Sequence, residues 1–433
     1  MFSQFYSHIH PIKAAMSGGK KQVTKSCSVE DDLSFMVVPD VGLKNSQLEF
    51  VLGMPINQCI AMMQQHPRML TKVELKYSKK NPYNRDIIIY IGSTGIKLYF
   101  DGVSQLIKLI EVDDLSKITL TYNDTVFSAP TNEATLERVN EFFGSTHPGS
   151  YDDKHNIYVQ SWPGLSFCFP TAAAGENFNL EPGFGPNLRS LKYDANSQPK
   201  LTKMSIYRGQ NPSAPEPVDT PFSCYCGQNR TRKVEAIWEN GAIVGINVEF
   251  DTQNGRIVDG EFEVSTYNRQ IFFGDSVSDV QSILGAPTKV FYRSDDKMKI
   301  HRGLHKETLY GPPNFFFNYF AMGMDILFDF VSKRVVKFVL HTNAPGHCDF
   351  GMYSRCNFHI KLNEQFTIRT DSKYEGFSST LGGPLTTRPV VLSRQEQQPF
   401  GPSLCYGTKQ VIVEVMENSH LSSVTIYDGS KEK

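Results

Sequence analysis

The sequence repeats one pattern, a pair of short apolar strands joined by a turn, at four separate places. The clearest example reads GIKLYF over Gly95–Phe100, a turn at Asp101–Gly102, and QLIKLIEV over Gln105–Val112. Apolar residues that alternate with polar ones around small turn residues are typical of antiparallel hairpins. The pattern recurs in three further pairs: Gly323–Asp329 with Arg334–His341, Gln410–Met416 with His420–Tyr427, and Gly164–Phe169 with Lys200–Tyr207.

A short helix is predicted upstream of each strand pair. The best example is Gly274–Gly285, where an apolar stripe at helical spacing consists of Val277, Val280, Ile283 and Leu284. Asp275 or Ser276 can cap the start of this helix, and Asp279 can complete a partial capping box. Gly285 supplies the turn that ends it. The other three helices are expected within 53–67, Thr135–Gly144 and Lys373–Gly382.

These elements predict an α+β, β-rich fold. We expect four divergent repeats of a short helix plus an antiparallel meander, arranged as two pseudo-paired halves. The expected organisation is a disordered N-terminal extension (1–32), an N-terminal half (33–215, with a loop insertion at about 170–199), a β-rich connecting segment (216–271) and a C-terminal half (272–430).

Composition narrows the possible partners. The chain has 44 Lys and Arg against 45 Asp and Glu, a formal net charge of −1. A near-neutral chain has no global field that attracts nucleic acid, so we expect no nucleic-acid partner, and any anionic contact must be local. Hydrophobic residues make up 40 % of the chain, which supports a packed core. The longest apolar runs, such as Ile87–Ile91, are far shorter than the roughly 20 residues of a transmembrane helix, and we expect none.

Cysteine usage indicates a reduced compartment. The 8 Cys include no CxxC pair, and the N-terminus has no long apolar stretch of the kind found in a secretory signal. We therefore expect a cytoplasmic protein. No cofactor is implied.

The segment His341–His359 is the most enzyme-like part of the sequence. It reads HTNAPGHCDFGMYSRCNFH and holds five candidate metal ligands: His341, His347, Cys348, Cys356 and His359. The spacing fits no standard zinc site, and structural roles, a metal site and a Cys–His nucleophile remain open. A metal-dependent hydrolase centred on His341, His347, Cys348 and His359 is the enzymatic alternative.

Two clusters of basic residues are candidate contacts for an anion or a phosphoinositide headgroup. The first consists of Arg293, Lys297, Lys299, His301 and Arg302, and the second of Lys72, Lys76, Lys79, Lys80 and Arg85. Solvated strand faces with Asp–Lys pairs are the alternative interpretation. A direct membrane-binding protein in vesicle trafficking is the function that these clusters would support.

The segment Phe315–Phe320, FFFNYF, predicts a strand that is apolar on both faces. Such a strand is either core or, if it lies exposed at an edge, a partner surface formed by Phe315, Phe317 and Tyr319. The sequence contains no P-loop, GxSxG, HExxH, EF-hand or GxGxxG motif. We therefore assign no catalytic, cofactor or metal residues and expect a protein that is not an enzyme.

Longer segments of the chain resemble the eukaryotic phagophore (phagosome) assembly factor family. The resemblance runs from about Leu33 to Tyr427 and is most specific in LEFVLGMP (Leu48–Pro55), IFFGDS (Ile271–Ser276), LGAPTKVFYRSDDKMKIH (Leu284–His301) and KFVLHTNAPGH (Lys337–His347). It implies a non-enzymatic autophagy adaptor that forms a complex with a β-propeller protein of the WD-repeat type. It also implies recruitment to the phagophore assembly site, with phosphoinositide membranes reached through the partner. No catalytic residues come with the resemblance.

Overall fold

The computed structural model describes most of the chain between residues 33 and 429. The described ranges are 33–144, 149–152, 154–171, 179–182, 189–192, 198–258, 261–292, 314–362, 366–375, 389–392, 401–407 and 410–429. The extension 1–32, which the sequence predicts to be disordered, lies outside them.

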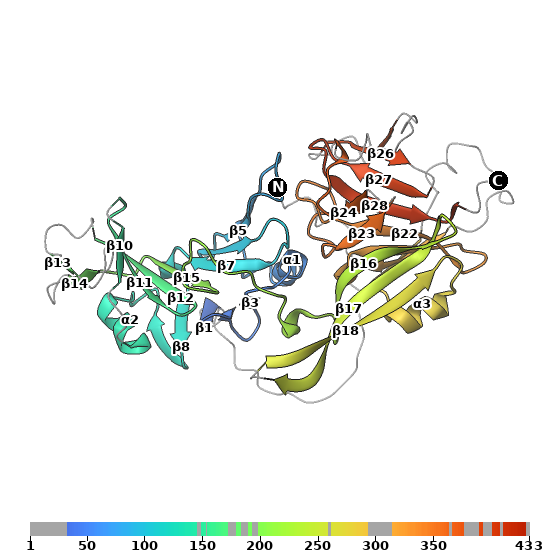
Figure 1. Cartoon of the computed structure of the whole chain (residues 1–433). Coiled ribbons are helices and arrows are strands. Elements are labelled where there is room, and N and C mark those ends of the chain that lie inside the picture. The colour runs from blue at the N-terminus through green and yellow to red at the C-terminus, as the bar shows by residue number, and fades with distance from the viewer. Residues whose placement is uncertain are drawn as a thin grey trace.

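The N-terminal half contains two large sheets (Figure 1, blue to green). The five-stranded sheet has the order β3 (Glu49–Val51), β2 (Gly42–Lys44), β1 (Ser34–Val38), β8 (Thr119–Tyr122), β9 (Thr125–Ser128). The eight-stranded sheet has the order β10 (Ser150–Asp152), β11 (Ile157–Trp162), β12 (Leu165–Pro170), β15 (Lys203–Tyr207), β7 (Ile107–Val112), β6 (Ile96–Phe100), β5 (Ile87–Ile91), β4 (Val73–Lys76). A small hairpin, β13 (Asn179–Pro182) and β14 (Arg189–Lys192), lies within the expected insertion.

The C-terminal half also contains two sheets (Figure 1, yellow to red). The five-stranded sheet has the order β18 (Glu261–Phe272), β17 (Ala242–Val258), β16 (Asn229–Glu239), β23 (Phe358–Lys361), β24 (Thr367–Arg369). The eight-stranded sheet has the order β19 (Lys289–Tyr292), β20 (Phe315–Tyr319), β21 (Met324–Phe328), β22 (Val335–His341), β28 (Leu421–Tyr427), β27 (Val411–Val415), β26 (Ser403–Gly407), β25 (Val390–Leu392). The residues expected to connect the halves thus supply three strands of a sheet.

The two halves have the same strand order. Each five-stranded sheet joins a three-stranded meander to a hairpin through one parallel pair, β1 with β8 or β16 with β23. Each eight-stranded sheet joins two meanders through their last strands, β7 with β15 or β22 with β28. All four hairpin pairs expected from the sequence are confirmed: β6 with β7, β12 with β15, β21 with β22, and β27 with β28. The predicted β-rich class is confirmed, whereas the four divergent helix–meander repeats stay a prediction.

Three α-helices are present in the described residues, and all three match predicted ones: α1 (Ile56–Gln65), α2 (Leu136–Phe143) and α3 (Val277–Leu284). The capping box of α3 is complete. The Asp279 N–H donates to Ser276 Oγ at 3.2 Å, and the Ser276 N–H donates to Asp279 Oδ2 at 3.0 Å. The fourth predicted helix, Lys373–Gly382, is described only as far as Glu375.

Each half has its own hydrophobic core, to which both of its sheets contribute. In the N-terminal half, Phe35 of β1 and Phe167 of β12 are fully buried in one cluster together with residues of α1 and α2. In the C-terminal half, Phe250 of β17, Phe338 of β22 and Val280 of α3 share the second cluster. Full burial of a side chain such as Phe contributes about 1.5–3 kcal/mol, so the Phe-rich composition goes largely into these cores.

Replacing the cap of α3 tests the local prediction. Ser276→Ala should lower the free energy of unfolding by about 1 kcal/mol, because the Asp279 N–H loses its acceptor. Ser278→Ala, in the first turn of the same helix, should change it by less than about half as much. Equal effects of the two substitutions in chemical denaturation would contradict the role of the cap.

Candidate functional site

The seam between the two halves is the first place where distant parts of the sequence meet. The Gln105 side chain, in the turn before β7, donates from Nε2 to the Asn343 carbonyl at 2.8 Å. Asn343 donates back from Nδ2 to Gln105 Oε1 at 2.7 Å. Both residues are buried, and the Gly351 N–H donates to the remaining Asn343 oxygen, Oδ1. The sequence did not predict this contact: Gln105 begins the expected strand Gln105–Val112 but lies in the turn before it, and Asn343 is within the His341–His359 segment.

Aromatic contacts extend the seam. The ring of Tyr83 lies between the Arg355 guanidinium, 4.2 Å from its centroid, and the His420 ring at 4.8 Å. His420 is buried, and burial together with the neighbouring Lys373 and Arg355 lowers its pKa to about 4. His420 is therefore neutral at physiological pH, and neither of its ring nitrogens has a hydrogen-bond partner among the described residues.

The residues of the His341–His359 segment do not form one site. His341, at the end of β22, lies 2.9 Å from Asp325 Oδ2 and stacks on Tyr353 at 3.7 Å. The Tyr353 hydroxyl and the Asn318 amide also donate to Asp325, which is buried. Burial, followed by the Asp325 charge, raises the pKa of Tyr353. Tyr353 therefore stays protonated, and this part of the segment is a satisfied structural network.

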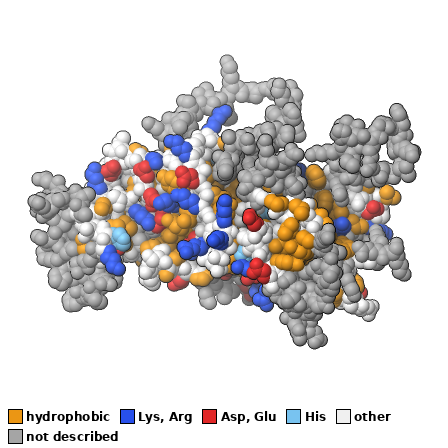
Figure 2. Space-filling model, turned by 90° about the horizontal axis from the view of Figure 1, so that it is seen from above, with side chains coloured by type: hydrophobic (Ala, Val, Ile, Leu, Met, Phe, Trp, Pro, Cys, Tyr) orange, Lys and Arg blue, Asp and Glu red, His pale blue; other side chains and the backbone are white. Residues whose placement is uncertain are grey.

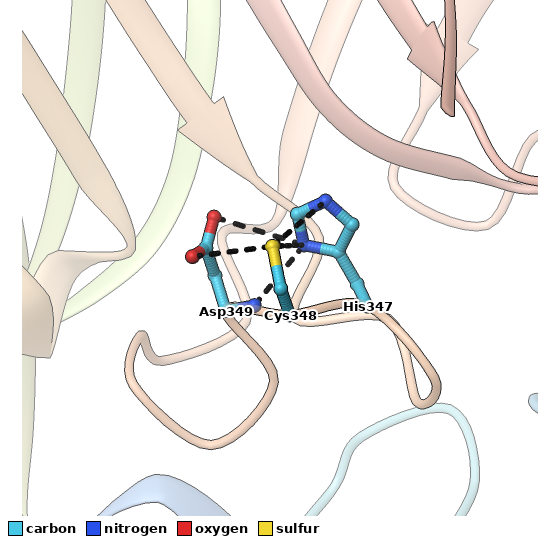
Figure 3. Close-up of side chains that lie close together, drawn as sticks. All are labelled: His347, Cys348 and Asp349. Carbon is cyan, nitrogen blue, oxygen red and sulfur yellow. Dashed lines mark hydrogen bonds and ion pairs between the residues drawn. The ribbon is translucent and has the colours of Figure 1, made fainter. Parts of the chain in front are cut away.

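His347, Cys348 and Asp349 form a separate cluster on one turn (Figure 3). The Cys348 sulfur lies 3.8 Å from His347 Nε2 and 3.6 Å from Asp349 Oδ1. His347 Nε2 is 3.3 Å from Glu414 Oε1 of β27, and Ser403 and Ser423 donate to the same carboxylate. Burial opposes the charged form of His347, but the side chains of Cys348 and Glu414 outweigh it and raise the pKa of His347 to about 9.

The four residues of the alternative metal centre, His341, His347, Cys348 and His359, do not come together in the fold. Among the described residues, the side chains close enough to share an ion are His347, Cys348 and Asp349. His341 is committed to Asp325, and His359 lies on β23 among Lys233, Arg369 and Glu235. Cys356 is fully buried, and burial raises the pKa of its thiol, so it is not a nucleophile. The metal alternative rested on closeness in sequence, and the segment passes through three different environments in the fold.

The two predicted basic clusters have different outcomes. Arg293, Lys297, Lys299, His301 and Arg302 lie outside the described residues. Lys72, Lys76, Lys79, Lys80 and Arg85 are all exposed, and they lie just before β4, at its end and in the loop that follows it. Figure 2 shows Lys and Arg side chains gathered at the left and centre of the upper face, interspersed with acidic ones. Glu74 pairs with Lys76 at 3.6 Å, with both side chains more than half exposed, so this pair contributes little.

The strand FFFNYF belongs to the core. Phe315, Phe317 and Tyr319 of β20 are each 5 % exposed or less and pack in the C-terminal cluster. Asn318 on the opposite face is also buried, through its bond to Asp325. Of the two interpretations of this strand, core packing is therefore correct, and these three aromatic side chains do not form a partner surface.

Comparison with known proteins gives one consistent family. The model of the phagosome assembly factor 1 (PHAF1) family matches residues 46–427. A PHAF1 protein of Caenorhabditis elegans is 81 % identical, covering 96 % of this chain and 100 % of its own. PHAF1 proteins of Drosophila melanogaster and Arabidopsis thaliana are 35 % and 30 % identical, covering 92 % and 91 % of this chain and 94 % and 93 % of their own. No solved structure matches significantly. Within the described residues, no helix is long and apolar enough to span a membrane.

The raised pKa of His347 predicts a pH-dependent stability. Because its folded pKa of about 9 lies above the ordinary 6.5, the stabilisation is complete below about pH 6.5 and is lost as the pH rises through 9. His347→Gln should remove a contribution on the order of 2 kcal/mol at pH 6 and flatten the decline. Denaturant unfolding between pH 6 and 9.5, under reducing conditions, measures this.

His155→Gln is the matched control for this measurement. His155 pairs with Asp152 at 2.7 Å, but its side chain is 68 % exposed, so its loss should leave the pH profile unchanged. A parent protein whose stability does not fall between pH 6.5 and 9 would contradict the ion pair of His347 with Glu414.

Proposed function

Since this chain belongs to the phagosome assembly factor 1 family, we propose that it is a non-enzymatic autophagy adaptor that forms a complex with a β-propeller protein. The observation that carries this proposal is the family match over residues 46–427, nearly all of the described chain. The proposed place of action is the phagophore assembly site, reached from the cytoplasm. Membrane phosphoinositides are contacted through the partner.

The architecture supports an adaptor built from repeated modules. We propose four divergent helix–meander units, two in each half. The matching strand orders support two paired halves, and they assign β16, β17 and β18, which the sequence placed in the connecting segment 216–271, to the C-terminal half. Repeated sheets create several edges and loop clusters, and such surfaces serve protein contacts.

The partner surface that we propose is the edge strand β19. It is the outermost strand of its sheet, and its apolar side chains Val290, Phe291 and Tyr292 are 41 %, 48 % and 56 % exposed. An edge strand with exposed aromatic side chains is a ready template for a further strand or an apolar contact from a partner. The proposed surface is therefore β19, and not Phe315, Phe317 and Tyr319 of the neighbouring strand β20, which are buried.

Substitution of this edge gives the test. The parent chain, purified from nutrient-starved cells, should carry a β-propeller protein, and Phe291→Ser with Tyr292→Ser should lose most of it. Val331→Ser is the control, because Val331 is 78 % exposed in the turn between β21 and β22 and should not matter. Failure to recover any β-propeller protein with the parent would overturn the proposed function. Recovery with the double variant would exclude only this surface.

Direct membrane binding in vesicle trafficking is the second candidate function. The favouring observation is the exposed basic surface formed by Lys72, Lys76, Lys79, Lys80 and Arg85. Each Lys or Arg near an anionic membrane contributes about 1 kcal/mol, so several together can hold a protein there without a partner.

Flotation of the isolated chain with liposomes tests this second candidate. Liposomes that contain a phosphatidylinositol phosphate should carry the chain upward at low salt and release it at high salt. Lys79→Glu with Lys80→Glu should abolish flotation, whereas Lys154→Glu, exposed in the turn between β10 and β11, should not. No flotation of the parent at low salt removes this candidate.

A further inference from the structure

A cavity of about 410 Å³ lies between the two halves. The N-terminal half contributes the start of α1, from Pro55 to Gln58, and the turn 103–106. The C-terminal half contributes the beginning of β16, the beginning of β23 and the end of β24. Cavities of 300–1,000 Å³ are typical of small-molecule sites, and such sites often lie between domains.

The lining of this cavity is strongly basic. It contains four arginines, Arg230, Arg232, Arg355 and Arg369, against a single acid, Asp371. Arg232 has partial partners, since Glu249 and Asp251 lie 3.7 and 3.6 Å from it. No carboxylate of the described residues lies within ion-pair distance of the other three. This excess of positive charge is local, because the whole chain carries a net charge of −1.

Three elements of the fold bring the arginines together. Arg230 and Arg232 both lie at the beginning of β16, beside its bulge between Thr231 and Lys233, and both line the cavity. Arg355 is held by the Thr342 carbonyl at 3.4 Å and by the Tyr83 ring of the seam. Arg369 ends β24 and pairs in register with His359 of β23. Arg230, Arg232 and Arg369 are therefore positioned by paired strands, and Arg355 by its contacts in the loop before β23.

Two further observations indicate a positive field. Helix α1 begins at the cavity with no side-chain cap and no acid in its first turn, so the positive end of its dipole is uncompensated. His359 also lines the cavity, and burial, followed by the charges of Lys233 and Arg369, lowers its pKa. His359 is therefore neutral, and it offers a hydrogen bond without adding to the repulsion.

We propose that this cavity binds a small anion with several phosphate groups, held across the seam by Arg230, Arg355 and Arg369. Guanidinium groups carry several donors and bind phosphate oxygens in pairs. Arg230 has a side-chain hydrogen bond with Tyr225 and Arg355 donates to the Thr342 carbonyl, but none of the three forms an ion pair with a carboxylate of the described residues. A single phosphate would fill only part of the cavity, so the ligand carries phosphates on a larger framework, as an inositol polyphosphate does. A volume of about 410 Å³ suits a small molecule rather than a nucleic acid strand. This site is independent of the β-propeller proposal and of the surface Lys72–Arg85.

Calorimetric titration of the full chain with inositol hexakisphosphate, at about 0.15 M salt, tests the proposal. The parent should bind, and Arg230→Glu or Arg369→Glu should each weaken Kd about tenfold or more, because a charge-assisted contact is lost and a repulsion is added. The milder Arg369→Gln should weaken binding to a smaller extent. Unchanged thermal unfolding of the ligand-free variants shows that they are folded.

Lys361→Glu is the matched control. Lys361 is exposed, lies on β23 two residues beyond His359, and is not part of the cavity lining, so its reversal should leave Kd unchanged. Citrate, a tricarboxylate, serves as the non-phosphate anion and should bind far more weakly. The proposal is overturned by no binding of the parent, by equal affinity for citrate, by arginine variants that bind like the parent, or by an equal effect of Lys361→Glu.

Vesicles identify the source of the phosphate. The parent chain is sedimented with phosphatidylcholine vesicles that contain a phosphatidylinositol phosphate. If the parent binds these vesicles and Arg369→Glu does not, the ligand is a lipid headgroup. Titration with the soluble anion but no sedimentation assigns the site to a free anion. Either result supports the arginine site. If the chain binds neither the soluble anion nor the vesicles, the site is excluded.

Discussion

The relative placement of the two halves depends on a pair of buried amides. Gln105 and Asn343 exchange two hydrogen bonds across the seam, and both have a positive φ, 57° and 51°, which places their backbones in the left-handed region. A buried amide left without a partner costs about 1–3 kcal/mol, so a different arrangement of the halves would have to satisfy both side chains again. Ser354 adds a bond to Asn57 of α1. The loop 342–356 is thus fixed to the N-terminal half, and His347 and Arg355 derive their positions from it.

Both eight-stranded sheets contain buried carboxylates on their strands. Glu111, Asp325 and Glu414 are each 7 % exposed or less. Each is surrounded by donors: Tyr99 and Lys203 for Glu111, Asn318, His341 and Tyr353 for Asp325, and Ser403, Ser423 and His347 for Glu414. Removing one partner of a buried charge costs several kcal/mol, so these networks hold the strands and the covering loop together. Two histidines that looked catalytic in the sequence have this structural task.

Local patterns in the sequence predicted the local structure well. Period-two alternation gave the hairpins, and the Ser276–Asp279 spacing gave a capping box, because both depend on residues within a few positions of each other. The seam escaped prediction because Gln105 and Asn343 are 238 residues apart and stand in turns without any periodic pattern. The same reason hid the arginine cavity, since Arg230, Arg355 and Arg369 come from separate strands and loops. The His341–His359 segment misled in the opposite way, through sequence closeness that the fold does not preserve.

The arginine cavity also changes what the balanced charge of the chain means. A net charge of −1 makes the long-range attraction of anions weak. The protein must therefore recognise an anion at short range, where the geometry of individual contacts matters more than the electrostatic field of the whole chain. Four guanidinium groups around one cavity repel each other, which destabilises the fold. A fold selected only for stability would place acidic side chains next to them. The eight-stranded sheet of the N-terminal half has this arrangement, since Lys203, Lys108 and Lys97 each pair with an acid. Among the four arginines of the cavity, Arg232 has acid partners, whereas Arg230, Arg355 and Arg369 have none among the described residues. These three mark the place where we propose that an external anion binds.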